Sequence, residues 1–314
     1  MKKTMIIAAL ALLMVGVSSC NKQKDGVYNP KQKISAVYEE YRSTSSYYNS
    51  STYTWEDNTP SVTPFHKAEE WTWDGKKLQE IRYFDSDGSI EYSMLFTYDG
   101  KRLSRVDYKD YDNLNDVWYT TYEYDGKELA TITTYEGGRV YSTCAITHAD
   151  KKISEIVETY YDYEKGARGG NYKATLRMLF PVGDMSERLI EKCEAKAKTK
   201  GTSTYVARIS LTWTDNNVTR IIYKWSDGET EMQNMTYDTK KNPYYGFMAL
   251  GDQDEGFDPW NLSENNVIAD GGESPYTYQY DKNDYPTSRM YSYSYREDYY
   301  RYTSTSTTTF EYVK

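Results

Sequence analysis

The chain has 314 residues, enough for one large domain or two ordinary ones, and its 38 basic and 47 acidic residues give a formal net charge of −9. This acidic balance argues against nucleic-acid binding, which requires a basic face. A mean hydropathy of −0.86 excludes a polytopic membrane protein, and 16% aromatic residues is too high for a disordered chain. Tyrosine dominates, with 36 Tyr against 7 Phe and 7 Trp. Because tyrosine buries a ring and keeps its hydroxyl in water, this composition favours broad, half-exposed sheets.

Residues 1–20 have the pattern of a bacterial lipoprotein signal. Lys2 and Lys3 precede an apolar stretch, residues 5–17, that is too short to span a membrane. The stretch ends in Val-Ser-Ser-Cys, so we expect cleavage before Cys20 and a lipid on its thiol. An ordinary signal peptide with an incidental cysteine is the alternative. A lipid on Cys20 makes the membrane a partner and predicts an outer-membrane lipoprotein that faces the periplasm or the medium.

A repeat organises the rest of the chain. Seven segments share an anchor that is aromatic or His, an apolar residue two positions earlier and an Asp one or two positions later. The anchors are Trp73, Tyr98, Tyr124, His148, Trp213, Tyr237 and Tyr280. Five of the seven segments also have apolar residues five and eight positions after the anchor, whereas the last two segments depart from this pattern.

The repeat has the pattern of a β-hairpin. Asp-Gly pairs follow three of the anchors, and Gly adopts the positive φ that tight hairpin turns require. The expected turn residues are Asp74, Gly75, Asp99, Gly100, Asp125 and Gly126. The apolar positions +5 and +8 differ by an odd number, so they cannot share one face of a regular strand. Either a bulge lies between them or the +5 residue belongs to the turn.

Two insertions interrupt the repeats. In the first, near residues 184–200, a capping box precedes apolar residues near helical spacing, which predicts one helix over residues 185–198. The second, near residues 251–272, is rich in Gly and Asp and predicts a long loop, with a short helical turn after Asn261 as an open alternative.

Both ends of the domain are also β-like. Residues 34–41 and 300–313 are expected strands, and residues 43–63 are either a loop or a polar strand. The expected organisation is a lipoprotein signal over residues 1–20, a tether over 21–32 and a single β-repeat domain over 33–314 with the two insertions.

The unit aromatic-x-Tyr-Asp-Gly-Lys-x-Leu-x-x-Ile resembles the tyrosine–aspartate repeats of Rhs-type bacterial surface proteins. Together with the signal, it makes the chain similar to a family of Bacteroidota lipoproteins of unknown function, over roughly residues 71–289. The resemblance implies an all-β fold, an antiparallel meander of repeated hairpins that forms an open or partly curled sheet, with one short helical insertion. It implies no reaction, because the family has no assigned catalytic residues.

The sequence offers little for catalysis. His66 and His148 are its two histidines, and neither has the spacing of a metal site or a catalytic triad. We therefore expect no metal and no cofactor, and take His148 as structural because it occupies an anchor position. The acidic residues 252–258 fail the EF-hand register, which leaves a solvated loop, with a different calcium site as the alternative. Cys144 and Cys193 form either a disulfide or two buried free thiols.

The leading interpretation is an envelope-anchored lipoprotein with a non-catalytic binding or structural role, whose partner is a glycan or an envelope protein. A glycan-binding lipoprotein of a nutrient-uptake system is the first alternative, since aromatic rings stack on the apolar faces of sugars. A glycoside hydrolase built on two carboxylates is the second alternative. The candidate ligand-stacking residues are Trp260, Tyr291, Tyr293 and Tyr295. The same rings would serve as cross-strand packing partners in a purely structural protein.

Overall fold

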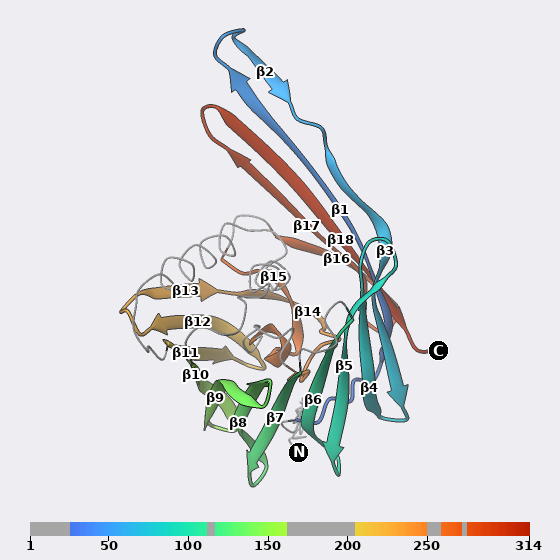
Figure 1. Ribbon diagram of the computed structural model, residues 1–314, viewed down its shortest axis with the longest axis vertical. Helices are drawn as coiled ribbons and strands as arrows, with labels where there is room; N and C mark the ends of the chain where they lie inside the picture. The colour runs from blue at the N-terminus through green and yellow to red at the C-terminus, as the bar shows by residue number, and fades with distance from the viewer. Residues whose placement is uncertain (1–25, 112–116, 162–204, 250–258, 272–274) are drawn as a thin grey trace, which may run out of the picture.

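The structure is a computed structural model in which the described residues are 26–111, 117–161, 205–249, 259–271 and 275–314. Within them the chain forms one antiparallel sheet of 16 strands and a separate sheet of two strands (Figure 1). The predicted all-β meander of hairpins is confirmed. The predicted helix over residues 185–198 lies outside the described residues. In the described part of the chain, no helix has the length and apolar character needed to cross a membrane.

The large sheet is built from consecutive hairpins. Its strands are β1 (Ile34–Asn49), β2 (Thr54–Asp57), β3 (Ser61–Asp74), β4 (Lys77–Phe84), β5 (Ile90–Asp99), β6 (Arg102–Asp110), β7 (Trp118–Asp125), β8 (Glu128–Glu136), β9 (Arg139–Ala149), β10 (Lys152–Tyr160), β11 (Tyr205–Thr214), β12 (Asn217–Trp225), β13 (Thr230–Asn234), β16 (Tyr276–Tyr280), β17 (Pro286–Arg296) and β18 (Tyr300–Tyr312). Their order is β13-β12-β11-β10-β9-β8-β7-β6-β5-β4-β3-β1-β18-β17-β16, with β2 beside β1. The two ends of the domain therefore meet where β1 pairs with β18.

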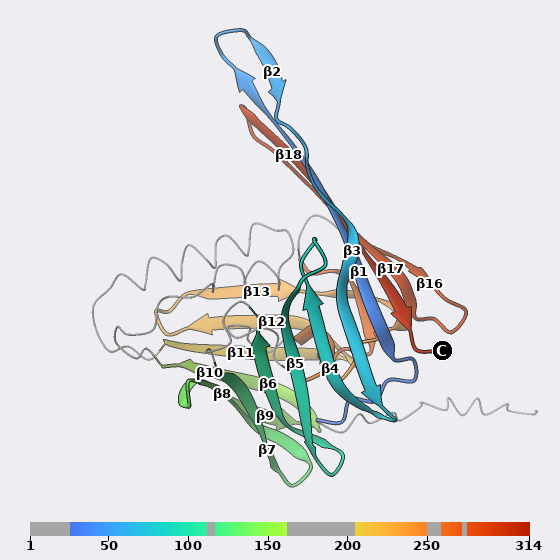
Figure 2. The same ribbon diagram turned by 45° about the vertical axis from the view of Figure 1, so that its right-hand side comes forward.

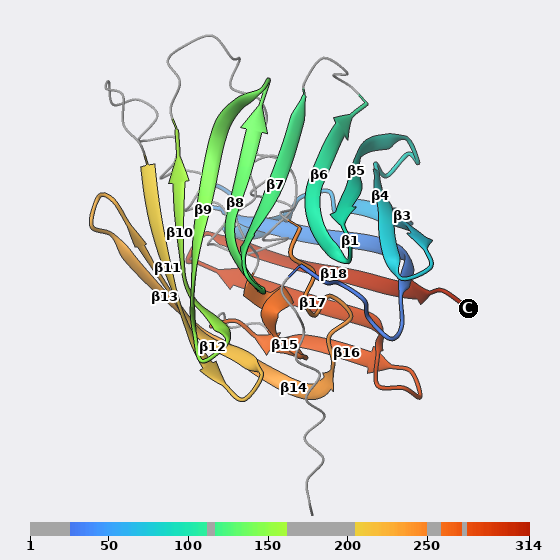
Figure 3. The same cartoon turned by 90° about the horizontal axis from the view of Figure 1, so that it is seen from below.

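The large sheet curls, and its outermost strands β13 and β16 do not pair with each other (Figure 3). A small sheet of β14 (Thr236–Lys241) and β15 (Asn265–Ala269) lies between these two edges. On one side, the Tyr237 hydroxyl donates a hydrogen bond of 2.6 Å to the carbonyl of Val218 in β12. On the other side, the Tyr278 hydroxyl of β16 donates one of 2.8 Å to the carbonyl of Val267. Of the two predicted forms of the sheet, the partly curled one is present.

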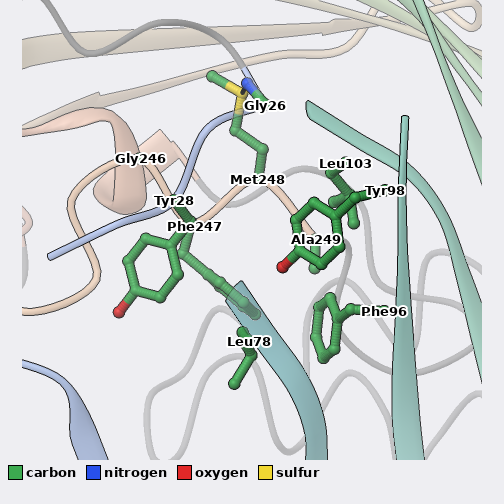
Figure 4. A pocket seen from close by; sticks show the side chains of 10 residues that line it. All are labelled: Gly26, Tyr28, Leu78, Phe96, Tyr98, Leu103, Gly246, Phe247, Met248 and Ala249. Carbon is green, nitrogen blue, oxygen red and sulfur yellow. Dashed lines mark hydrogen bonds between the residues drawn. The ribbon is translucent and has the colours of Figure 1, made fainter. Parts of the chain in front are cut away.

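Two segments, residues 26–33 and 242–249, fill the concave side of the sheet. The ring of Tyr28 lies 5.2 Å from that of Phe247, which in turn lies 5.4 Å from the Trp71 ring of β3. The space left at this contact is about 10 Å³, roughly the room of one water molecule (Figure 4). The interior is therefore a packed core. Residues 26–32 were expected to belong to a tether, but Tyr28 is only 7% exposed and anchors them in this core.

Part of the sheet projects beyond the body as an arm, formed by β2 and the adjoining parts of β1, β3, β17 and β18 (Figures 1 and 2). Here β1 continues to Asn49 and pairs with β18, β2 and β3. The polar stretch over residues 43–63 is therefore mainly strand, because a neighbouring strand on each side satisfies its backbone groups despite its Ser- and Thr-rich sequence. Figure 2 shows the arm as a single layer with no second sheet against it.

The second insertion contains regular structure. Its described part has the short 3-10 helix η1 (Pro259–Leu262) followed by β15. The prediction of a long loop is wrong for residues 265–269, because they pair with β14. Asp238 in β14 reinforces this pairing by accepting a hydrogen bond of 3.1 Å from the backbone N–H of Asn266. This contact joins residues 28 positions apart, so local composition does not reveal it.

Each of the first five repeats has a bulge six positions after its anchor. In the first repeat, the register shift between Thr72 and Trp73 leaves Gln79 without a partner on the facing strand. The equivalent bulged residues are Ser104, Ala130, Ser154 and Thr219. One extra residue restores the parity of the strand. Leu78 and Ile81 therefore both face the core, 1% and 0% exposed, and the bulge is the correct one of the two predicted explanations.

One type of hydrogen bond joins successive repeats. The anchor ring donates it to the carbonyl at position +5 of the preceding repeat. Tyr124 makes this bond to Leu103 at 2.8 Å, and Trp213 makes it to Ile153 at 2.7 Å. Tyrosine and tryptophan can both donate from the ring edge and phenylalanine cannot. This requirement explains why no anchor is Phe, and it accounts for part of the tyrosine excess in the composition.

Candidate binding surfaces

The three predicted stacking tyrosines of β17 lie on one face of the arm. Tyr291, Tyr293 and Tyr295 are opposite Ser306, Ser304 and Tyr302 of β18, respectively. Residues directly opposite each other in an antiparallel pair point to the same side of the sheet. The three rings therefore share their side with Tyr302. Their serine neighbours in β17 lie on the other side and are exposed.

The same side gathers tyrosines from β1 as well. Tyr41 is opposite Ser306 and Tyr47 is opposite Tyr300, so both point to the side of the β17 rings. We call the resulting surface the tyrosine face. Its members are Tyr41, Tyr47, Tyr291, Tyr293, Tyr295, Tyr300 and Tyr302. Seven rings from three neighbouring strands thus cover one side of a single-layered sheet.

The rings of the tyrosine face are partly open to solvent. Tyr47, Tyr295 and Tyr300 are 41%, 39% and 38% exposed, and the other four are half-buried. Neighbouring rings contact one another obliquely, with centroids 6.2 Å apart for Tyr293 and Tyr302 and 6.4 Å for Tyr295 and Tyr300. The Tyr295 hydroxyl also donates to the carboxylate of Glu297. The surface is therefore neither a dry core nor a set of freely rotating side chains.

Trp260 does not belong to the tyrosine face. It lies in η1, where its ring meets that of Tyr276 edge-on at 5.6 Å. The Tyr276 ring lies 5.0 Å from that of Tyr291. Tyr276 is 9% exposed, and burial raises the pKa of its hydroxyl well above the ordinary value. The structure thus connects Trp260 to the base of the tyrosine face through one buried ring that sequence reasoning missed.

The predicted turn residues lie at the end of the sheet opposite the arm, where each Asp is the last residue of its strand and each Gly lies in the turn that follows. Gly75, Gly100 and Gly126 have φ values of +54°, +59° and +57° and lie in the β3–β4, β5–β6 and β7–β8 turns. A Cβ atom added at any of the three would meet nothing within 4 Å. Backbone conformation, and not lack of space, is therefore the reason for glycine at these positions.

A cavity of about 800 Å³ opens beside these turns. Five basic side chains line it, together with the carboxylates of Asp74 and Asp99. The basic residues are Lys76, Lys77, Lys101, Arg102 and Lys127. The N-terminal residues 27–29 form another part of its wall. This excess of positive charge stands out in a chain with a net charge of −9.

One carboxylate on the concave side has a pKa near neutrality. Burial raises the pKa of Glu69 to about 7, although the Trp71 N–H, 2.6 Å away, favours the ionised form. The negative charge of Glu39 raises this pKa further, and the positive charge of Arg289 opposes that effect. A glycosidase requires two carboxylates facing one sugar. Here one oxygen of Glu69 is already bound to the Trp71 indole.

The remaining candidate residues have structural surroundings. The His148 Nδ1 lies 4.0 Å from a carboxylate oxygen of Glu128, and the His66 Nδ1 lies 3.0 Å from the carbonyl of Pro64. Across the described ranges, no group of three or more His, Cys, Asp or Glu side chains has a geometry that holds a metal ion. Cys144 is buried and forms no disulfide with a described residue, and its thiol donates a hydrogen bond of 3.9 Å to the carboxylate of Glu158. Cys20 and Cys193 lie outside the described residues.

Comparison with known proteins finds no matching family model and no matching curated protein. Among solved structures, a porin-like protein from Bacteroides uniformis is similar over 86% of this chain and 97% of its own, with a TM-score of 0.37 and 11% identity. A TcdB2-TccC3-TEV structure is similar over 74% of this chain and 12% of its own, with a TM-score of 0.30 and 11% identity.

Proposed function

We propose that the protein is a lipid-anchored, non-catalytic lipoprotein of the outer membrane that binds a glycan on the tyrosine face of its arm. The observation that carries the proposal is the gathering of seven tyrosines from three neighbouring strands on one side of a single layer. Each ring offers an apolar face to the apolar face of a sugar. Each hydroxyl at the ring edge can exchange hydrogen bonds with sugar hydroxyls.

The exposure of the rings favours this function over a purely structural role. Rings that serve only as packing partners are expected to be covered, because exposed aromatic surface contributes little to stability. Three members of the tyrosine face instead keep more than a third of their surface open. The layer has no second sheet to cover it. Contiguous exposed aromatic surface of this kind is typical of a binding site.

The lipid anchor is supported by residues 1–20 and by the resemblance to Bacteroidota lipoproteins with tyrosine–aspartate repeats. We expect mass spectrometry of the mature N-terminus to show an acylated Cys20. A chain that begins at Asn21 or later, or an unmodified Cys20, would contradict the anchor. This measurement is independent of any ligand.

Glycan binding is tested on a glycan array, which is probed with the mature chain carrying Cys20→Ala so that no lipid is attached. We expect binding to neutral or acidic glycans and its loss when Tyr293→Ala and Tyr295→Ala are combined. The matched control is Tyr299→Ala, because Tyr299 is 67% exposed in the β17–β18 turn and its ring contacts that of Tyr48, which points to the side of β1 opposite Tyr47. If the chain with an unsubstituted tyrosine face gives no signal on the array, glycan binding is contradicted. Binding that survives the double substitution but not the control contradicts the tyrosine face.

A further inference from the structure

The third residue after the anchor is a lysine in the first four repeats, and in the first three of them this lysine lines the cavity beside the turns. Lys76, Lys101 and Lys127 follow Trp73, Tyr98 and Tyr124 in this way, and we call them the lysine row. Each lies at the tip of a hairpin turn and is exposed. Consecutive turns are two strands apart, so the row has a period of roughly 10 Å at the usual strand spacing. No ion pair among the described residues involves these three side chains.

The basic residues beside the lysine row have other contacts. The Lys77 ammonium lies over the Tyr98 ring at 5.3 Å, and the Arg102 guanidinium lies over the Tyr124 ring at 4.8 Å. Arg102 also donates a hydrogen bond of 2.7 Å to the carbonyl of Gly126. These two side chains hold neighbouring repeats together. The lysine row therefore carries the positive charge that is available to a partner.

The row lies where the chain leaves the domain toward its N-terminus. Val27 lines the same cavity as all three lysines. Cys20 is seven residues earlier, which gives a reach of at most roughly 25 Å for an extended chain. If Cys20 carries a lipid, as the proposed function holds, the hairpin tips with the lysine row are the part of the domain closest to the bilayer.

The geometry points to the lysine row as a contact surface for the anionic headgroups of the membrane that holds the lipid. A negative leaflet attracts lysines near its surface, and the attraction decays within a Debye length. The rest of this acidic chain is repelled by the same surface. The two effects together press the hairpin tips onto the membrane and turn the remainder of the domain away from it.

This contact determines where the arm points. Strand β3 begins in the arm at Ser61 and ends beside the lysine row at Asp74, so the two regions lie at opposite ends of one strand, roughly 40 Å apart at 3.3 Å per residue. Figure 1 shows the β1–β2 end of the arm at the opposite extreme of the long axis from the β3–β4, β5–β6 and β7–β8 turns. A membrane-bound lysine row therefore presents the tyrosine face away from the bilayer.

The test uses the full mature chain with Cys20→Ala, so that the lipid does not hold the protein on the vesicles. We expect this chain to sediment with vesicles of phosphatidylglycerol and phosphatidylcholine at low salt but not with phosphatidylcholine alone. Reversal of the row, Lys76→Glu, Lys101→Glu and Lys127→Glu together, should weaken binding at least about tenfold. The control reverses three exposed basic residues near the opposite ends of their strands, Lys109, Arg139 and Lys224, and has the same net charge.

Equal loss in the row variant and the control would overturn the proposal, because only net charge would then matter. Absence of binding to the anionic vesicles would overturn it as well. A third arm uses dextran sulfate as a soluble polyanion. Row-dependent binding to dextran sulfate without vesicle binding would assign the row to a soluble acidic polymer and contradict the membrane contact. None of these outcomes depends on the glycan array. Failure of the membrane contact can therefore be distinguished from failure of glycan binding by the tyrosine face.

Discussion

The ammonium of Lys77 lies 5.3 Å from the centroid of the Tyr98 ring, so a side chain four positions after one anchor covers the anchor of the next repeat. Lys152 repeats this contact with Trp213 at 5.1 Å. A cation over an aromatic face is attractive even at an exposed site. The anchor ring is thus held on one edge by a carbonyl of the preceding repeat and on one face by a cation.

His148 is the one anchor of the seven that is neither Tyr nor Trp. The residue four positions after the preceding anchor is here Glu128, whose carboxylate lies 4.0 Å from the His148 Nδ1. We predict that Glu128→Lys lowers the free energy of unfolding by about 0.5–1 kcal/mol, because it places a cation beside an imidazole. Adding His148→Tyr should restore most of this loss by rebuilding the cation–ring pair. Urea unfolding of the two single variants and the double variant gives the coupling energy. If the two substitutions change the unfolding free energy additively, residue 128 and the anchor at position 148 do not interact.

The turn glycines give a second prediction. Gly100→Val should lower the free energy of unfolding by ~1 kcal/mol or more, because a β-branched residue is strained at the φ of +59°. Gly100→Asn is the matched control, since Asn tolerates positive φ. The chain itself supports this choice, because Asp150 and Asp215 adopt φ values of 52° and 51° in equivalent turns. Thermal unfolding of the two variants should therefore differ, and equal melting temperatures would contradict the conformational explanation.

Much of the repeat was predictable because its signals are local. The recurrence of apolar residues at Leu78 and Ile81 identified core positions, and Asp-Gly pairs identified turns. The bulge at Gln79 was one of two options, because a bulge and a longer turn correct the strand parity equally well. The contacts between these cations and the anchor rings of the next repeat were not predictable, because Lys77 and Tyr98 meet only after the register between two hairpins is fixed.

The tyrosine face shows the same limit on a larger scale. The alternation of Tyr291, Tyr293 and Tyr295 with serines is visible in the sequence, and in β17 it puts the three rings on one side of the strand. Tyr41 and Tyr302 are 261 residues apart, and their hydroxyls meet because β1 pairs with β18. No short-range pattern encodes that pairing. The position of Trp260 in η1 depends on the fold of the second insertion, so its contact with the Tyr276 ring could not be predicted.

Glu69 predicts a pH dependence of stability. Its pKa rises from 4.5 to about 7 on folding, so the folded chain holds this proton more tightly than the unfolded chain. The stability from this group is present below about pH 4.5 and is lost as the pH rises through 7. The loss should be roughly 1–2 kcal/mol, less than the full shift implies at 1.36 kcal/mol per pH unit because Glu69 is partly exposed.

Two substitutions check the assignment to Glu69. Glu69→Gln should flatten the dependence of the unfolding free energy on pH between 4.5 and 7. Trp71→Phe removes the N–H that favours the ionised carboxylate, so it should move the midpoint of the transition to higher pH. Urea unfolding measured across this pH range gives both results. An unchanged pH profile in Glu69→Gln would assign the titration to another group.

Tyr293 separates the structural role of the tyrosine face from its proposed binding role. Its ring is half-buried and contacts Tyr302 at 6.2 Å, in a layer against which the described strands place no second sheet. Tyr293→Ala should therefore lower the free energy of unfolding by about 1–2 kcal/mol, well below the 3–5 kcal/mol expected for a fully buried ring. Glycan binding should fall at the same time, at temperatures where the variant remains folded. Tyr293→Phe keeps the ring, so it should retain stability and the part of the affinity that comes from stacking. If Tyr293→Ala lowers the free energy of unfolding by about 3 kcal/mol or more and the unsubstituted chain binds no glycan, the rings serve only as packing partners.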